Sequence, residues 1–97
     1  MRGLLGRKYL RQGEGMVLRP GWSIHTAFMR FPIDAVFLDK DLRIERIASD
    51  LKPWRMAAKR GAKQVLELSA GEASRRGLAV GQRLVLRDQE RDEPAES

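Results

Sequence analysis

The chain of 97 residues contains no cysteine and only one histidine, His25. Without a thiol there is no disulfide scaffold, no cysteine nucleophile and no cysteine-ligated zinc or iron–sulfur site. A single imidazole also excludes metal sites built on several histidines of one chain. No apolar run approaches the ~20 residues that span a bilayer, and the first residues lack the apolar stretch of a signal peptide. We therefore expect no cofactor, no resident metal, no membrane association and a cytoplasmic location.

Acidic residues are fewer than basic ones, with 13 Asp and Glu residues against 19 Lys and Arg residues. The last ten residues hold one arginine and five acidic residues, a net charge of −4, which leaves +10 on residues 1–87. A basic body can indicate an anionic partner, and an acidic tail could compete for the same surface. Because the basic residues form no run of five or six, we favour ordinary surface charge and keep nucleic acid as an alternative partner.

Short apolar or alternating segments predict about five short strands. These segments are residues 16–18, 33–38, 42–47, 64–68 and 83–87. One short helix is predicted near residues 70–76, with Ser69 and Glu72 forming a capping box. Asp39-Lys40-Asp41 is predicted to be a hairpin turn, and residues 50–63, which show no clear period, a long loop.

Strands and helices do not alternate along the chain, and this order favours an antiparallel sheet over a parallel one. We predict a mostly β fold, α+β with little helix, in the form of a small antiparallel open barrel or sandwich. Residues 1–87 are expected to form a single globular domain. Residues 88–97 are polar and acidic, and are expected to be a disordered tail.

The densest group of chemically useful side chains lies between His25 and Asp34. It combines an imidazole, the Thr26 hydroxyl, the Met29 thioether, the Arg30 guanidinium and a carboxylate. A carboxylate inside an apolar strand is costly unless a cation or several donors pair with it. Asp34 could accept backbone N–H bonds and lock the nearby bend. Alternatively, it could orient His25 within a polar pocket.

Two tryptophans, Trp22 and Trp54, have basic residues nearby, as in Trp54-Arg55. Exposed aromatic side chains beside arginines can stack on the bases of a single strand. Large aromatic residues at loop ends often cover the core instead, and we favour that interpretation.

Ser23, His25 and Asp34 contain the residue types of a catalytic triad. No nucleophile-elbow glycine pattern surrounds Ser23, however, and this disfavours hydrolysis.

Four segments of the chain form a specific combination of motifs. They are His25-Thr26-x-x-Met29-Arg30-Phe31-Pro32-Ile33-Asp34-x-x-Phe37-Leu38-Asp39, Lys52-Pro53-Trp54-Arg55, Gly61-Ala62-Lys63-x-Val65-Leu66-Glu67-Leu68-x-Ala70-Gly71 and Gly77-Leu78-x-x-Gly81-x-x-Leu84. With these segments the sequence resembles a small prokaryotic family, the domain of unknown function 192 (DUF192). The resemblance covers roughly residues 15–86 and implies a compact, mostly β domain. It implies little about activity, because the family has no established biochemistry. Gly21 stands where many similar members have a cysteine, and Gln82 replaces the usual acidic residue.

We therefore expect a non-enzymatic binding module with a polar pocket between His25 and Asp34, for an anionic small ligand or a protein partner. The residues expected to bind are His25, Thr26, Met29, Arg30, Asp34, Trp54 and Arg55. No catalytic residue is expected. A nucleic-acid-binding domain that uses the basic body is the alternative, and a hydrolase or isomerase with His25 as general base is a weaker one.

Overall fold

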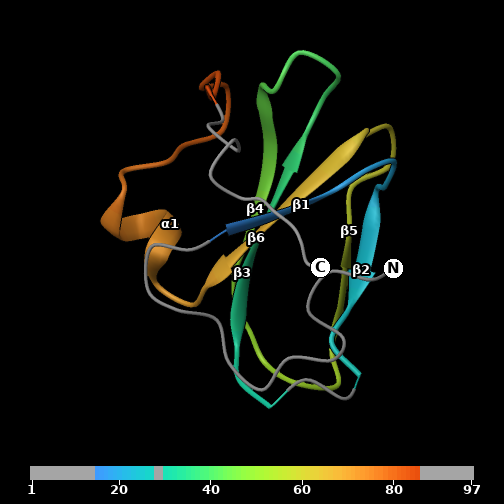
Figure 1. The fold of residues 1–97 in the computed structure, drawn as a ribbon, viewed down its shortest axis with the longest axis vertical. Helices are drawn as coiled ribbons and strands as arrows, with labels where there is room; N and C mark the ends of the chain where they lie inside the picture. Colours follow the sequence, from blue (N-terminus) through green and yellow to red (C-terminus); the bar gives the residue numbers. More distant parts are fainter. Residues whose placement is uncertain (1–14, 28–29, 86–97) are drawn as a thin grey trace, which may run out of the picture.

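The computed structural model describes residues 15–27 and 30–85, which contain six strands and one short helix (Figure 1). The four strands of the larger sheet are β1 (Gly15–Leu18), β3 (Ile33–Leu38), β4 (Ile44–Leu51) and β6 (Gln64–Ser69). They pair in the antiparallel order β1-β6-β3-β4. The smaller sheet pairs β2 (Ser23–His25) with β5 (Met56–Ala58). The helix α1 (Glu72–Arg75) follows β6. The predicted mostly β fold with one short helix is confirmed, and its sheets do not close into a barrel.

The two central strands, β3 and β6, are mostly apolar, as suits strands that are covered on both faces. All six residues of β3 are buried. On one face of the larger sheet, residues such as Ala35 and Phe37 pack against Ile24 and Ala57 of the smaller sheet. On the other face, residues such as Val36 pack against α1 and the segment that follows it. The molecule is therefore layered, with the larger sheet between the smaller sheet and α1.

The β3–β4 connection is a tight turn held by Asp39. Its Oδ1 accepts the backbone N–H groups of Asp41 at 2.8 Å and Arg43 at 2.9 Å. Leu42 lies in the left-handed region, with φ of 69°. The bond from the Arg43 N–H lowers the pKa of Asp39 despite a partial desolvation of the carboxylate, and the bond from Asp41 adds to the lowering. The predicted hairpin turn is confirmed: the Asp39 carboxylate accepts two N–H groups of the turn, and Leu42 takes the positive φ that a glycine adopts in other hairpins.

The structure differs from the prediction in two segments. The prediction of a long loop over residues 50–63 is wrong, because β4 continues to Leu51 and β5 lies within this range. β5 has three residues, too few to show a period, and it is a strand because it pairs with the distant β2. Of the predicted strand 83–87, the described part contains only an isolated bridge between Arg83 and Arg43.

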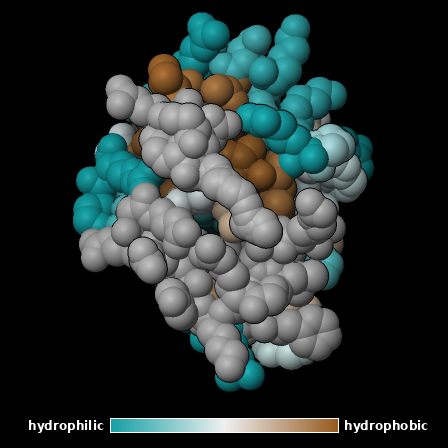
Figure 2. All heavy atoms as spheres, viewed as in Figure 1, coloured by the Kyte–Doolittle hydropathy of each residue, from teal (hydrophilic) through white to brown (hydrophobic). Residues whose placement is uncertain are grey.

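The helix is also shorter than predicted, and its N-cap position is occupied by Gly71 instead of the predicted Ser69. It begins after Gly71, whose φ is 94°, and no capping side chain comes from that residue. The predicted acidic tail, 88–97, lies outside the described residues. Figure 2 shows hydrophilic side chains along the upper and side edges of one face of the molecule and hydrophobic side chains in its upper half.

Candidate functional site

Asp34 is buried, with 1% of its surface exposed, and its carboxylate accepts hydrogen bonds from the backbone. Oδ1 accepts the N–H of Asp50 at 2.9 Å, and Oδ2 accepts the N–H groups of Gly71 at 3.0 Å and Ala73 at 2.9 Å. A carboxylate that satisfies the free N–H groups at a helix start does the work of an N-cap. Here the cap comes from β3 rather than from the helix. The three bonds therefore fix α1 and the end of β4, and not the bend that precedes β3.

The structure does not bring Asp34 and His25 together. Side chains alternate along β3, so that Ile33 and Ala35 pack between the two sheets while Asp34 lies on the α1 side. His25 belongs to the smaller sheet, on the opposite side of β3, and is exposed. In the described part of the chain, neither His25 nor Arg30 hydrogen-bonds Asp34. In the described part of the chain, the His25 and Asp34 side chains therefore do not face each other.

A hollow of about 300 Å³ does lie beside Asp34. Its other lining residues are Ser49, Asp50, Ala70, Gly71 and Ser74. Both charged residues of this lining are acidic, which makes the hollow unsuitable for an anion. Of the other residues expected to bind, Arg30 is exposed and Met29 lies outside the described residues.

Thr26 is fully buried and holds the turn that carries Trp54 and Arg55. Its Oγ1 lies 2.7 Å from the Lys52 carbonyl oxygen and accepts the N–H of Arg55 at 2.8 Å. Its main chain adds two bonds, from the Thr26 N–H to the Arg55 carbonyl at 2.8 Å and from the Trp54 N–H to the Thr26 carbonyl at 3.2 Å. Trp54 is held with φ of 64°. Thr26 therefore positions two residues of the predicted set rather than facing a ligand.

Large side chains are exposed along the smaller sheet. Trp22 is 52% exposed, Trp54 63% and Met56 68%. The register places His25 opposite Met56, so that both project from the sheet on the side away from the buried Ile24. The expectation that the tryptophans cover the core is wrong, because both present more than half of their surface to solvent.

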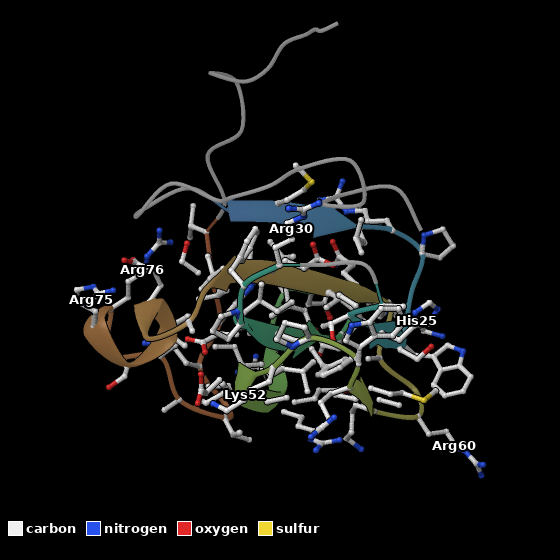
Figure 3. The ribbon with its side chains drawn as sticks, turned by 90° about the horizontal axis from the view of Figure 1, so that it is seen from below. His25, Arg30, Lys52, Arg60, Arg75 and Arg76 are labelled. Carbon is white, nitrogen blue, oxygen red and sulfur yellow. The ribbon has the colours of Figure 1, made fainter. Side chains whose placement is uncertain are left out.

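We call this exposed set the β2–β5 surface. It consists of Trp22, His25, Trp54, Arg55, Met56 and Arg60, all of which are exposed. Trp22 and Trp54 lie at opposite ends of the β2–β5 ladder, since Lys59 N–H bonds Trp22 O and Trp54 N–H bonds Thr26 O. Four residues of extended chain separate the two ends by roughly 13 Å. Figure 3 shows His25 and Arg60 at one end of the molecule and Arg75 and Arg76 of the α1 region at the other.

One buried ionisable residue, Glu67, was not identified from the sequence. It lies on β6, opposite Ala35 of β3 and Met16 of β1, with none of its surface exposed. Neither carboxylate oxygen has a hydrogen-bond partner among the described residues. Desolvation raises the pKa of Glu67 to about 7. The available signal was its place in a central strand, where a glutamate has no wet face.

Neither a metal-binding group nor a membrane-crossing helix is found within the described ranges. No three or more His, Cys, Asp and Glu residues there are grouped closely enough to hold a metal ion. Among the same residues, no helix has the length and apolar character needed to cross a membrane.

The fold and its exposed side chains define a class: a small two-sheet β domain with exposed aromatic and cationic residues at the two ends of the smaller sheet. The model of the uncharacterised family DUF192, described as Uncharacterized ACR, matches residues 1–86. The chain therefore belongs to the DUF192 family, as its sequence motifs predicted. No curated protein matches the chain.

Two solved structures are similar to the chain. One is a protein of unknown function from Novosphingobium aromaticivorans DSM 12444, with a TM-score of 0.73 and 29% sequence identity. The match covers 82% of this chain, which spans only 62% of the length of that protein. The other is described as a "putative transcription regulator" from Sinorhizobium meliloti 1021, with a TM-score of 0.75 and 27% identity over 84% of this chain and 69% of that one.

Proposed function

We propose that the protein is a non-enzymatic binding module, and that the β2–β5 surface binds single-stranded nucleic acid. The observation that carries the proposal is the exposure of Trp22 and Trp54 at the two ends of one short ladder, with Arg55 next to Trp54 and Arg60 just beyond the Trp22 end. Indole rings stack on any base, and each stacked base contributes about 1–3 kcal/mol of binding free energy. Arginine side chains add attraction to the phosphates.

Two further facts support this choice over a pocket between His25 and Asp34. The Asp34 carboxylate accepts three backbone N–H bonds on the α1 side of the larger sheet, so it is not available on the His25 side. The charge of +10 on residues 1–87 also suits an extended polyanion. The similar protein described as a transcription regulator agrees with a nucleic-acid partner, although at 27% identity it adds little weight. A cytoplasmic location remains part of this proposal.

The test is a fluorescence anisotropy titration with a labelled single-stranded oligonucleotide of mixed sequence, at low and at near-physiological salt. We expect saturable binding that weakens with salt. Trp54→Ala should reduce affinity about tenfold or more, and Trp22→Ala by a similar factor. Val80→Ala is the matched control, because Val80 is also 63% exposed but belongs to another part of the chain, and it should leave affinity unchanged.

Three results would overturn the proposal. The first is no binding even at low salt. The second is binding that both tryptophan variants retain in full, which would mean attraction by charge alone. The third is equal or tighter binding of a poly-glutamate peptide, which would indicate an acidic protein segment as the partner. Denaturant unfolding of each variant confirms that the fold is retained.

A further inference from the structure

A second concave region lies away from His25 and Asp34, where the end of β1, the β3–β4 turn and the start of β6 meet. It is a hollow of about 500 Å³. Its lining residues are Arg19, Pro20, Lys40, Leu42, Lys63 and Gln64. The hollow is open to solvent rather than enclosed, so a ligand there would be covered on one side only. We call this region the lysine hollow.

The lysine hollow is positively charged, because three of its lining residues are cationic and none is acidic. Within the described residues, Lys40 and Lys63 take part in no ion pair. The neighbouring Asp39 carboxylate attracts Lys40, which helps to lower the pKa of Asp39, but this carboxylate does not line the hollow. Cations that share a concave surface repel one another unless an anion lies between them. The charge pattern therefore favours an anionic ligand.

The scaffold of the lysine hollow is fixed by hydrogen bonds. The buried Gln64 accepts a bond from Arg19 Nε through Oε1 and donates from Nε2 to the Asp39 carbonyl at 3.0 Å. The main chain of Lys63 is bonded on both sides, from the Gly21 N–H at 3.0 Å and to the Leu38 carbonyl at 2.8 Å. Gln64 thus holds the Arg19 guanidinium in place at the hollow. A site whose charged groups are already positioned pays less to bind.

The remaining lining of the lysine hollow is apolar and comes from Pro20 and Leu42. A bare inorganic ion would leave these side chains exposed to water, whereas a ligand with an apolar body would cover them. We propose that the lysine hollow binds a small phosphate ester. Its phosphate lies between Lys40, Lys63 and Arg19, and its apolar part packs on Leu42 and Pro20. This site is separate from the β2–β5 surface, and it does not depend on the proposed binding of nucleic acid.

The experiment is a calorimetric titration of the full chain with phenyl phosphate, inorganic phosphate and phenol. We expect phenyl phosphate to bind, inorganic phosphate to bind several-fold more weakly and phenol not to bind. Lys40→Gln and Lys63→Gln should each reduce the affinity for phenyl phosphate about tenfold, the loss expected for one charge-assisted bond. Arg60→Gln removes the same charge outside the hollow and should change the affinity less than about twofold.

The same variants separate this proposal from the proposed function. Lys63→Gln should leave oligonucleotide affinity within about twofold of the unmodified protein, whereas Arg60→Gln should reduce it and leave phenyl phosphate binding intact. No heat of binding for phenyl phosphate at millimolar concentration would overturn the site. Unchanged binding by both lysine variants would overturn it too. If the lysine variants weaken oligonucleotide and phenyl phosphate binding equally, the hollow is part of a nucleic-acid path and the small-molecule proposal fails.

Discussion

Asp34 and Glu67 are both buried carboxylates of the larger sheet, and they lie on its opposite faces. Asp34 faces α1 and accepts three backbone N–H bonds. Glu67 lies in the layer between the two sheets, and neither of its oxygens has a partner among the described residues. Burial of a carboxylate is favourable only when donors replace the lost water. Among the described residues, Asp34 has such donors and Glu67 has none.

The difference separates a structural carboxylate from one that the fold tolerates at a cost. The polarity of Asp34 is used up in joining β3 to β4 and to the start of α1. For Glu67 the folded protein favours the protonated, neutral form, since desolvation raises its pKa to about 7. The two residues should therefore respond in opposite ways when their charge is removed.

Asp34→Ala gives the largest expected effect. The change leaves three backbone N–H groups without their acceptor, two of them at the start of α1. We expect the free energy of unfolding to fall by about 4 kcal/mol, as when one partner of a buried charged group is removed. Urea unfolding followed by circular dichroism measures this loss.

Asp41→Ala is the control for Asp34→Ala. Asp41 is exposed in the β3–β4 turn, and its carboxylate has no hydrogen bond in the described part of the chain. Its removal should change stability by no more than about 0.5 kcal/mol. If Asp34→Ala costs as little as Asp41→Ala, the three bonds do not hold the fold and the contrast with Glu67 disappears.

Glu67→Gln gives the next largest effect, and it depends on pH. The ordinary pKa of this group is 4.5, and in the folded protein it is about 7. Between these values the folded state holds more protons than the unfolded state, so stability falls as pH rises through this range. The contribution of Glu67 is complete below pH 4.5 and lost above pH 7. The loss amounts to about 3 kcal/mol.

The measurement for Glu67 is the free energy of unfolding of both proteins from pH 4.5 to above pH 7. The difference between unmodified protein and Glu67→Gln should change by about 3 kcal/mol over this range, with the variant favoured at the higher pH. Glu67→Leu should show the same change in slope, because it also removes the titration. Parallel curves for all three proteins would mean that Glu67 is solvated or paired.

The fold could largely be predicted because its central strands carry their pattern locally. The six apolar-rich residues of β3 were predicted with the bounds that the structure shows. β5 was missed, because three residues contain too little pattern and the strand depends on its distant partner β2. Strand pairing between distant segments overrides local propensity in such cases.

The site could be predicted only in part, because proximity in sequence is not proximity across a sheet. His25 and Asp34 are nine positions apart, yet the Asp34 side chain points to the α1 side of the larger sheet and His25 lies in the smaller sheet on the other side. Thr26, Trp54 and Arg55 belong to the set of residues predicted to bind, and hydrogen bonds of Thr26 join them in the structure. The lysine hollow was not predicted, since its lining comes from three separate segments of the chain.

Thr26→Val tests the smallest expected effect and adds a neutral group to the comparison. Thr26 is fully buried like Asp34 and Glu67, and its hydroxyl is bonded to the main chain of Lys52 and Arg55. Valine has nearly the same shape but lacks these bonds, so stability should fall by about 2 kcal/mol in urea unfolding. Thr26→Ser keeps the hydroxyl and should retain most of the stability. If satisfied polar groups stabilise the fold whatever their charge, Thr26→Val should lose less stability than Asp34→Ala. Above pH 7, Thr26→Val should lower the stability, whereas Glu67→Gln should raise it. A valine variant as stable as the unmodified protein would mean that the 52–55 turn is held by its main chain alone.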